Sequence, residues 1–341
     1  MSAAELEMPE CLGVPLASLG VLRARGPDVV SFLQGQLSSD VAQLAADRSL
    51  FSGYHNPQGR VIALLRLVRL APDDVLAILP RELVAGVAQR LAKFILRSKV
   101  KLLDDSAAWT LTGLIARAAG TPGTASGEPR SALAALIEQL PAVVGASAAV
   151  GGSLAVRLAP PHARWLLITP KSAAVPAALP ACAPGTEEAW RRAGVAAGEP
   201  EVVGATSEEF VAQMLNLDAL GAIAFDKGCY TGQEVIARAH YRGRVKRRMQ
   251  RFIAHGSRML HPGDAGELAD GRPYKVVVAV PLAGGGCEFL AVAPLIGVAP
   301  EAGNAPAAGN AAATRPAAAA PARLASPLDA EQLALPYPLP G

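Results

Sequence analysis

Apolar residues along the first third of the chain change period in a way that predicts successive elements. Over residues 61–70 four of them share one side of a strand, and a second apolar run at 75–79 follows a turn. Over 81–96 the apolar positions fall on one helical stripe, and 99–103 returns to a strand. A β-β-α-β order predicts an α+β domain with antiparallel pairing rather than a doubly wound sheet.

Helix start signals predict three further helices. Residues 26–37 form a short amphipathic helix with proline in its first turn. Residues 186–198 contain a second helix, which includes Trp190 and ends at Gly194. Thr206 and Glu209 have the spacing of a capping box and predict a third helix from that point.

The C-terminal part of the chain differs in its composition and in the length of its apolar runs. Short β-prone runs at 275–280 and 287–292 lie between glycine-rich turns, as in a small β domain. Ala, Pro and Gly dominate 298–325, which we interpret as a disordered insertion. The apolar end, 333–340, is expected to dock back, and 117–130 is expected to be a surface loop.

Composition narrows the function classes. No window holds eighteen strongly apolar residues, and the acidic N-terminus lacks the pattern of a signal peptide, so we expect a cytoplasmic protein without a membrane partner. The four cysteines are far apart and form no Cys-x-x-Cys pair, and the histidines make no ligand-spaced pair. We therefore expect no metal site and no disulfide framework.

The net charge of +3 is unevenly distributed. Residues 238–251 carry seven Lys or Arg residues and no acid. Such a run fits phosphate, a polyglutamate tail or weak nucleic-acid contact, or it is simply a solvated surface. Tyr241 is its one aromatic residue, too few for an RNA-stacking platform.

The octapeptide Lys-Gly-Cys-Tyr-Thr-Gly-Gln-Glu at 227–234 is the most informative motif. The apolar run 221–225 before it predicts a strand, and 235–240 after it predicts a helix. Thr231 and Glu234 have the spacing of a capping box for that helix.

Cys229 would then lie on the loop before a helix N-terminus. The helix end and the nearby Lys227 ammonium both favour a thiolate there. Gly228 and Gly232 on either side allow sharp bends or close approach of a ligand. The alternative is that Cys229 is a small buried hydrophobe.

The octapeptide with its flanks, 216–249, resembles the signature of the YgfZ folate-binding proteins, relatives of the T-protein (aminomethyltransferase) of the glycine cleavage system. Segments 32–41, 56–66 and 97–100 agree with it, and the resemblance runs from about residue 16 to 255. It implies a T-protein-like folate-binding fold of intertwined ferredoxin-like subdomains with a small C-terminal β-barrel.

The domain division expected from the resemblance and the composition has three parts. Residues 12–252 form the folate-binding domain, 253–297 plus 326–341 form the barrel, and 298–325 is the insertion.

The resemblance also implies a role. Members of this family support the assembly or repair of iron–sulfur clusters, and thereby enzymes such as the tRNA methylthiotransferase. The implied cofactor is tetrahydrofolate or a related reduced folate, and the implied partners are iron–sulfur assembly factors or client enzymes. Cys229 matches the cysteine that this role needs, although a lone thiolate cannot hold a cluster by itself.

The family places a tryptophan beside the folate where this chain has Trp190, which would stack on a pterin or be a packed helix residue. A second tryptophan of the family is Leu19 here, and a glutamate is Ala196. The loop residues expected to contact the cofactor are Lys227, Gly228, Tyr230, Gly232, Gln233 and Glu234. For Glu234 a structural helix cap is the simpler account.

Residues 60–65 lack the carboxylates that aminomethyltransferases carry at this place, so we expect no glycine-cleavage activity and an accessory factor rather than an enzyme. Two alternatives stay open. One is a folate-dependent one-carbon transfer enzyme with Cys229 as nucleophile. The other is a direct RNA-binding protein that uses 238–251.

Overall fold

The computed structural model describes residues 10–116, 132–177, 179–241, 243, 245–296 and 326–340. The loop predicted at 117–130 and the insertion predicted at 298–325 lie outside these residues. The division into domains therefore stays a prediction.

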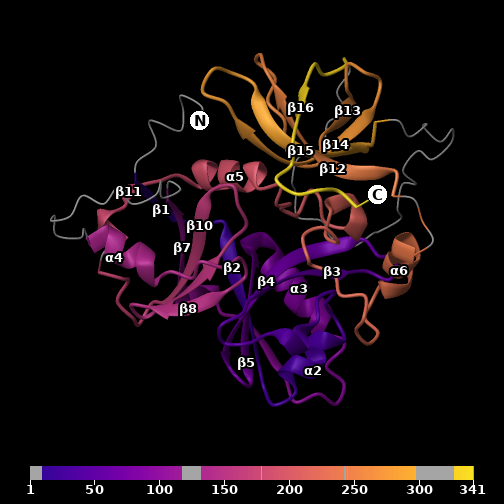
Figure 1. Cartoon of the computed structure of the whole chain (residues 1–341). Helices are drawn as coiled ribbons and strands as arrows, with labels where there is room; N and C mark the ends of the chain where they lie inside the picture. The colour runs from indigo at the N-terminus through magenta and orange to yellow at the C-terminus, as the bar shows by residue number, and fades with distance from the viewer. Residues whose placement is uncertain are drawn as a thin grey trace.

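The described residues form three sheets, antiparallel except where β1 pairs with β11 (Figure 1). The first has the order β11-β1-β7-β10-β9-β8, the second β3-β4-β5-β2-β6 and the third β13-β14-β15-β12-β16. The strands of the first sheet are β1 (Cys11–Pro15), β7 (Trp109–Ala116), β8 (Ser147–Val150), β9 (Ser153–Arg157), β10 (Ala163–Pro170) and β11 (Ala183–Pro184). Those of the second are β2 (Leu19–Arg25), β3 (Leu50–His55), β4 (Val61–Ala71), β5 (Asp74–Pro80) and β6 (Lys101–Asp104). Those of the third are β12 (Arg247–Ala254), β13 (Ala265–Glu267), β14 (Pro273–Pro281), β15 (Cys287–Pro294) and β16 (Glu331–Leu333).

Five α-helices connect the described strands: α2 (Val29–Gln34), α3 (Arg81–Ala92), α4 (Ala132–Gln139), α5 (Glu187–Ala196) and α6 (Gln233–Tyr241). Short 3-10 helices occur at Val41–Gln43, Ser106–Ala108, Leu179–Ala181 and Ala212–Leu215. None of the described helices is both long and apolar enough to cross a membrane.

The β-β-α-β order predicted for the first third of the chain is confirmed by β4, β5, α3 and β6. The strands pair antiparallel, and Val84, Val87 and Leu91 of α3 are buried against them. The helix ends at Ala92, four residues earlier than predicted. The apolar side chain of Leu96, beyond this end, is exposed.

The predicted end of the second helix at Gly194 was wrong. Helix α5 begins after Thr186, whose hydroxyl accepts from the Ala189 amide, and it continues through Gly194 to Ala196. The left-handed residue that follows it is Gly198, with φ of +61°.

Thr206 does not open a helix. The 204–211 segment makes turns instead, because its backbone pairs with β4: the Glu208 amide donates to Val61 O, and the Val61 amide donates to Phe210 O. Only the 3-10 turn at Ala212–Leu215 follows.

The strands predicted at 275–280 and 287–292 are confirmed as the central strands β14 and β15 of the third sheet. Among the described strands β13 and β16 remain edges, joined only by one bridge between Leu268 and Leu328, so the sheet is not the closed barrel that we expected. The predicted docking of the C-terminal segment is confirmed, since the Tyr337 hydroxyl donates to Gly198 O at 2.7 Å.

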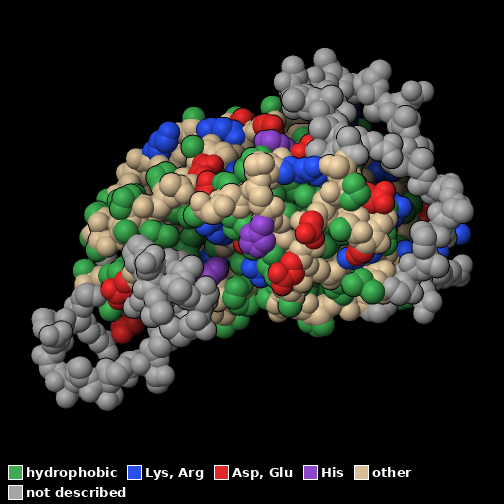
Figure 2. Space-filling model, turned by 90° about the horizontal axis from the view of Figure 1, so that it is seen from above, with side chains coloured by type: hydrophobic (Ala, Val, Ile, Leu, Met, Phe, Trp, Pro, Cys, Tyr) green, Lys and Arg blue, Asp and Glu red, His purple; other side chains and the backbone are tan. Residues whose placement is uncertain are grey.

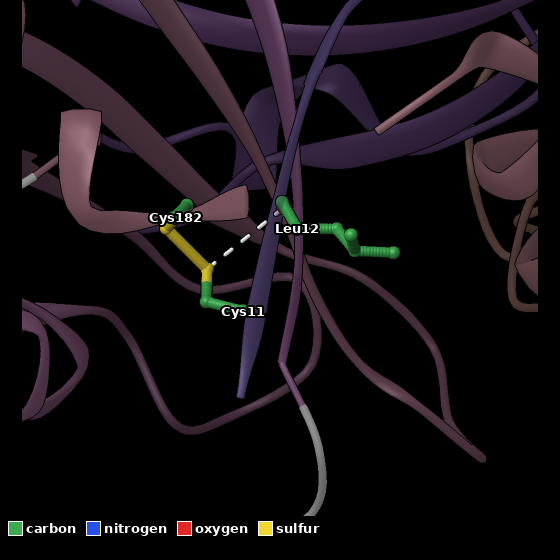
Figure 3. Close-up of a disulfide and its surroundings, with 3 residues drawn as sticks. All are labelled: Cys11, Leu12 and Cys182. Atoms are coloured by element: carbon green, nitrogen blue, oxygen red, sulfur yellow. Dashed lines mark hydrogen bonds between the residues drawn. A yellow bond between two sulfur atoms is a disulfide. The ribbon is translucent and has the colours of Figure 1, made fainter. Parts of the chain in front are cut away.

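Cys11 and Cys182 form a disulfide, although we expected no disulfide framework (Figure 3). The reason is tertiary: β1 and β11 are parallel neighbours, with Leu12 opposite Ala183, so the residues just before them lie 4.8 Å apart at Cα. The bridge joins residues 171 positions apart and ties down the strand that leads into α5.

Helix α5 lies at the junction of the sheets. It contacts β1 and β7 of the first sheet on one side and β14 and β15 of the third sheet on the other, and Figure 1 shows it running beneath the third sheet. A side chain on α5 can therefore face the space where the sheets meet.

Candidate functional site

A cavity of about 140 Å³ lies where the three sheets meet. Its walls come from β2, β3, β4 and β5 of the second sheet, β10 of the first, β14 of the third, and α5. Most of the lining is apolar, and Leu19 and Trp190 are both part of it. Mostly apolar walls with a few polar groups are typical of small-molecule sites.

Six charged residues line this cavity, and three of them, from different parts of the chain, form one ion-pair cluster. Arg66 of β4 donates to one oxygen of the Glu199 carboxylate at 2.6 Å, and Arg164 of β10 donates to the other at 2.8 Å. Burial by itself would raise the pKa of Glu199, but the two arginines outweigh it and hold that pKa below its usual value. Glu199, whose side chain is 17% exposed, is therefore a largely buried carboxylate with its charge retained.

Arg164 keeps unused hydrogen-bonding capacity. Its side chain is 2% exposed, and its Nε has no hydrogen-bond partner among the described residues. Burial lowers the pKa of its guanidinium. A buried donor of this kind gains when a ligand supplies an acceptor.

Trp190 projects from α5 and is partly buried against the core between the first and second sheets. A Cβ on Gly113 of β7 would lie 2.4 Å from its ring, so the glycine makes room for the indole. The Arg164 guanidinium lies over the ring, 5.4 Å from its centroid. Trp190 is thus both a packed helix residue and part of the cavity wall.

The Cys229 loop differs locally from the prediction. Residues 221–225 form no strand, because Ala224 N donates to Ser38 O and Ala222 O accepts from the Ser38 hydroxyl, which are single bonds rather than a ladder. The helix after the loop is confirmed as α6.

The capping pair lies one residue earlier than predicted. Gln233 Oε1 accepts from the Tyr230 amide at 3.3 Å, and the Gln233 amide donates to Tyr230 O. Thr231 and Glu234 form no such pair among the described residues, and Glu234 is exposed.

Cys229 is a free, exposed cysteine, so the alternative of a small buried hydrophobe is wrong. Lys227, two residues earlier, turns its ammonium away into the protein. It donates to the carbonyls of Gln34, Leu37 and Ser39 at 2.7, 2.6 and 2.7 Å. Burial lowers the pKa of Lys227 to about 8, against the charge of Asp40, which raises it.

The other loop residues are mostly structural. Tyr230 is 7% exposed, lies in the core beneath the loop, and burial raises its pKa to about 12. Gly232 has φ of +83°, and a Cβ there would lie 2.6 Å from Asn56 O. A Cβ on Gly228, by contrast, would meet nothing within 4 Å.

Trp190 and the Cys229 loop are not brought together. None of residues 227–234, all of which are described, lines the cavity. The β3–β4 hairpin separates the two places: Phe51 lines the cavity, whereas His55, about 13 Å further along the strand, faces Tyr230 with ring centroids 6.3 Å apart.

The basic run 238–251 is not one exposed stripe. Arg248 is buried and forms a bidentate ion pair with Asp218 at 2.9 Å, and Arg251 pairs with Glu288 at 2.7 Å. Arg238 and Arg247 are exposed. On the face seen in Figure 2, basic and acidic side chains are interspersed rather than separated.

From the sequence we did not predict Arg66, Arg164 and Glu199 as site residues. The available signal was an arginine inside each of two strongly apolar strands, β4 and β10, which a core position tolerates only with a partner. Among the described residues no group of three His, Cys, Asp or Glu side chains could hold a metal ion.

No family model matches the chain. The chain is 32% identical over 279 residues to the tRNA-modifying protein YgfZ of Edwardsiella ictaluri (strain 93-146), over 80% of this chain and 81% of that one. It is 32% identical over 254 residues to the tRNA-modifying protein YgfZ of Photorhabdus laumondii, over 74% and 73%.

Among solved structures, the glycine cleavage system aminomethyltransferase T from Bartonella henselae matches with a TM-score of 0.62. The match covers 85% of this chain and 80% of that chain at 14% identity, so it shows the fold alone. The expected α+β, T-protein-like fold is thereby confirmed. The extent and identity of the sequence matches show that the chain belongs to the YgfZ family.

Proposed function

We propose that this protein is a cytoplasmic, folate-binding accessory factor that supports iron–sulfur cluster assembly or repair, and through it tRNA modification. The observation that carries the proposal is family membership, because the relatives are named tRNA-modifying proteins. The exposed thiol of Cys229 supports it as the working group.

The cavity fits a reduced folate chemically. Apolar walls suit a flat heterocycle, Trp190 offers an aromatic surface, and the unpartnered Nε of Arg164 offers a buried donor to a ring carbonyl or nitrogen. Glu199 offers a charged acceptor to ring amino groups, held in place by Arg66 and Arg164. When bound, the folate would supply one-carbon or redox chemistry of its pterin ring.

The placement of Cys229 favours an accessory role over one-carbon transfer. A nucleophile must lie within bonding reach of the reacting carbon, and Cys229 is not among the residues that line the cavity. The β4 residues in the wall are Leu64 and Arg66, neither of which is a carboxylate. We propose that no amine acceptor is turned over with methylene-tetrahydrofolate.

Cargo or client proteins would meet the Cys229 loop rather than the cavity. One thiolate cannot hold a cluster, so any cluster at Cys229 would need ligands from a partner. We propose iron–sulfur assembly factors or iron–sulfur enzymes as these partners.

Titration with tetrahydrofolate, followed by tryptophan fluorescence, tests the folate part. Saturable quenching in the wild type that is lost in Trp190→Phe would support it, and absence of binding by calorimetry would contradict it. Trp165, which is buried in the first sheet away from the cavity lining, supplies the matched control in Trp165→Phe.

Complementation tests the iron–sulfur part. A strain lacking the gene should show reduced methylthiolated tRNA, restored by the wild type and by Cys287→Ser but not by Cys229→Ser. Cys287 is the matched control because it is also a free cysteine but is buried. Normal methylthiolation in the deleted strain, including under oxidative stress, would contradict this role.

A further inference from the structure

A second cavity, of about 210 Å³, lies beside the first. Leu19 lines both, and at two places adjacent residues divide between them: Ser18 faces the first cavity and Ala17 the second, and Pro80 faces the first and Arg81 the second. The Arg81 amide donates to Ser18 O at 2.8 Å across this boundary. Leu19 and the end of the β2–β5 ladder therefore lie at the boundary of the two cavities.

The charge of the second cavity differs from that of the first. Its charged lining residues are Arg81 and Lys171, with no carboxylate, and the hydroxyl-bearing Ser106 and Thr110 also line it. Neither the Arg81 nor the Lys171 side chain has an ion-pair or hydrogen-bond partner among the described residues. Two unpaired cations beside one cavity favour an anionic occupant.

Three acids that lie close in sequence to residues of the second cavity are engaged elsewhere. Glu82, beside Arg81, accepts from the Gly204 amide at 2.7 Å. Asp104 accepts from the Ser106 hydroxyl, and Asp105 accepts from Trp109 Nε1. None of these carboxylates forms an ion pair with Arg81 or Lys171.

The sizes of the two cavities point to a shared ligand. Each is smaller than the roughly 300 Å³ at which pockets for drug-sized molecules begin, and the two together pass that size. We propose that they form one binding track, in which the first cavity holds a flat heterocycle and Arg81 and Lys171 bind the carboxylates at the far end of the same molecule. This inference rests on the proposed function, and for a folate it assigns the second cavity to the γ-linked glutamate tail.

Calorimetry with three ligands tests the track: tetrahydropteroate, which lacks glutamate, tetrahydrofolate with one glutamate, and its triglutamate form. The wild type should bind the triglutamate about tenfold more tightly than tetrahydropteroate, because two exposed ion pairs contribute about that factor. In the double variant Arg81→Gln/Lys171→Gln this ratio should fall to about one, with tetrahydropteroate affinity unchanged. Lys101→Gln, an exposed lysine on β6 outside both cavities, should leave the ratio intact.

A ratio that survives the double substitution would overturn the track while leaving the proposed function standing. If the wild type binds none of the three ligands, the folate proposal fails instead, and free γ-triglutamate and inorganic phosphate are then titrated alone. Binding of either one that Arg81→Gln/Lys171→Gln abolishes would support an independent anion site. Equal binding by the double variant, or none by the wild type, would overturn the anion site as well.

Discussion

The Lys227 ammonium donates a hydrogen bond to the Leu37 carbonyl at 2.6 Å, although 190 positions separate the two residues in the chain. Two further carbonyls, of Gln34 and Ser39, complete the set. The loop that presents Cys229 is thus fastened to the end of α2 by a residue that the sequence suggested as an activator of the thiol. In the structure this ammonium is an anchor.

Lys227→Met should lower the free energy of unfolding by about 2–3 kcal/mol, because it leaves three carbonyls without their charged donor. It should also speed alkylation of Cys229 by iodoacetamide as the loop loosens. Urea unfolding and alkylation rates measure the two effects, with the exposed Lys101→Met as control. Unchanged stability with slower alkylation would show instead that Lys227 acts on the thiol through its charge.

The two glycines of the loop should differ in their tolerance of alanine. Gly232→Ala should cost about 2–3 kcal/mol, because alanine is strained at φ of +83° and its Cβ would meet Asn56 O. Gly228→Ala should change stability by less than about 0.5 kcal/mol, since its Cβ would enter open space. Urea midpoints compare them, and equal costs would mean that the loop backbone differs from the one described.

His55 should make the protein acid-sensitive. Burial lowers the pKa of His55 to about 3, whereas an unfolded chain titrates near 6.5. Between these values the unfolded state binds more protons, so stability falls as the pH falls from about 6.5 towards 3, by ~3 kcal/mol at pH 4. In His55→Phe the loss between pH 7 and pH 4 should be smaller by that amount. The same pH slope in both proteins would contradict the buried, neutral histidine.

Glu199→Gln should destabilise the protein by roughly 3–5 kcal/mol, because it leaves the buried Arg164 and the partly buried Arg66 without their counter-charge. The matched control is Glu188→Gln, which breaks the exposed pair with Arg192 and should cost less than about 0.5 kcal/mol. Chemical denaturation measures both. Equal small effects would mean that water or a rearranged partner replaces the Glu199 carboxylate.

Reduction of the disulfide should lower the free energy of unfolding by about 2–4 kcal/mol, since the bridge closes a loop of 171 residues in the unfolded chain. Thermal unfolding with and without dithiothreitol measures the difference. Cys11→Ser should remove the sensitivity to dithiothreitol, whereas Cys287→Ser should retain it. Retained sensitivity in Cys11→Ser would mean that another pair of cysteines is bridged.

Long apolar patterns determined much of the fold from the sequence. Helix α3 was predicted because it buries one face, and the period of that face is written in consecutive residues. Strands β4 and β5 were predicted because each is an apolar run bounded by turns, and both faces of each strand are largely buried. The octapeptide determined the family and the presented cysteine, because loop, cysteine and following helix are local features. The helix at 233–241 needed no distant contact to be recognised.

Tertiary structure decided the features that depend on residues far apart in the chain. The segment at 204–211 pairs with β4 instead of forming a helix, because its backbone finds better partners there than within itself. Pairing of Cys11 with Cys182 follows from the neighbouring strands β1 and β11, which no spacing rule encodes.

The features of the candidate site also fall into those that the sequence determined and those that the tertiary structure decided. The sequence by itself determined that Cys229 is presented and that Trp190 lies on a helix. Only the tertiary structure placed them at different ends of the β3–β4 hairpin, gathered Arg66, Arg164 and Glu199 from separate elements, and turned Lys227 inward. The physical reason is that a buried charge must be neutralised or hydrogen-bonded by whatever groups the packed fold brings near it, and those groups have no fixed distance in sequence.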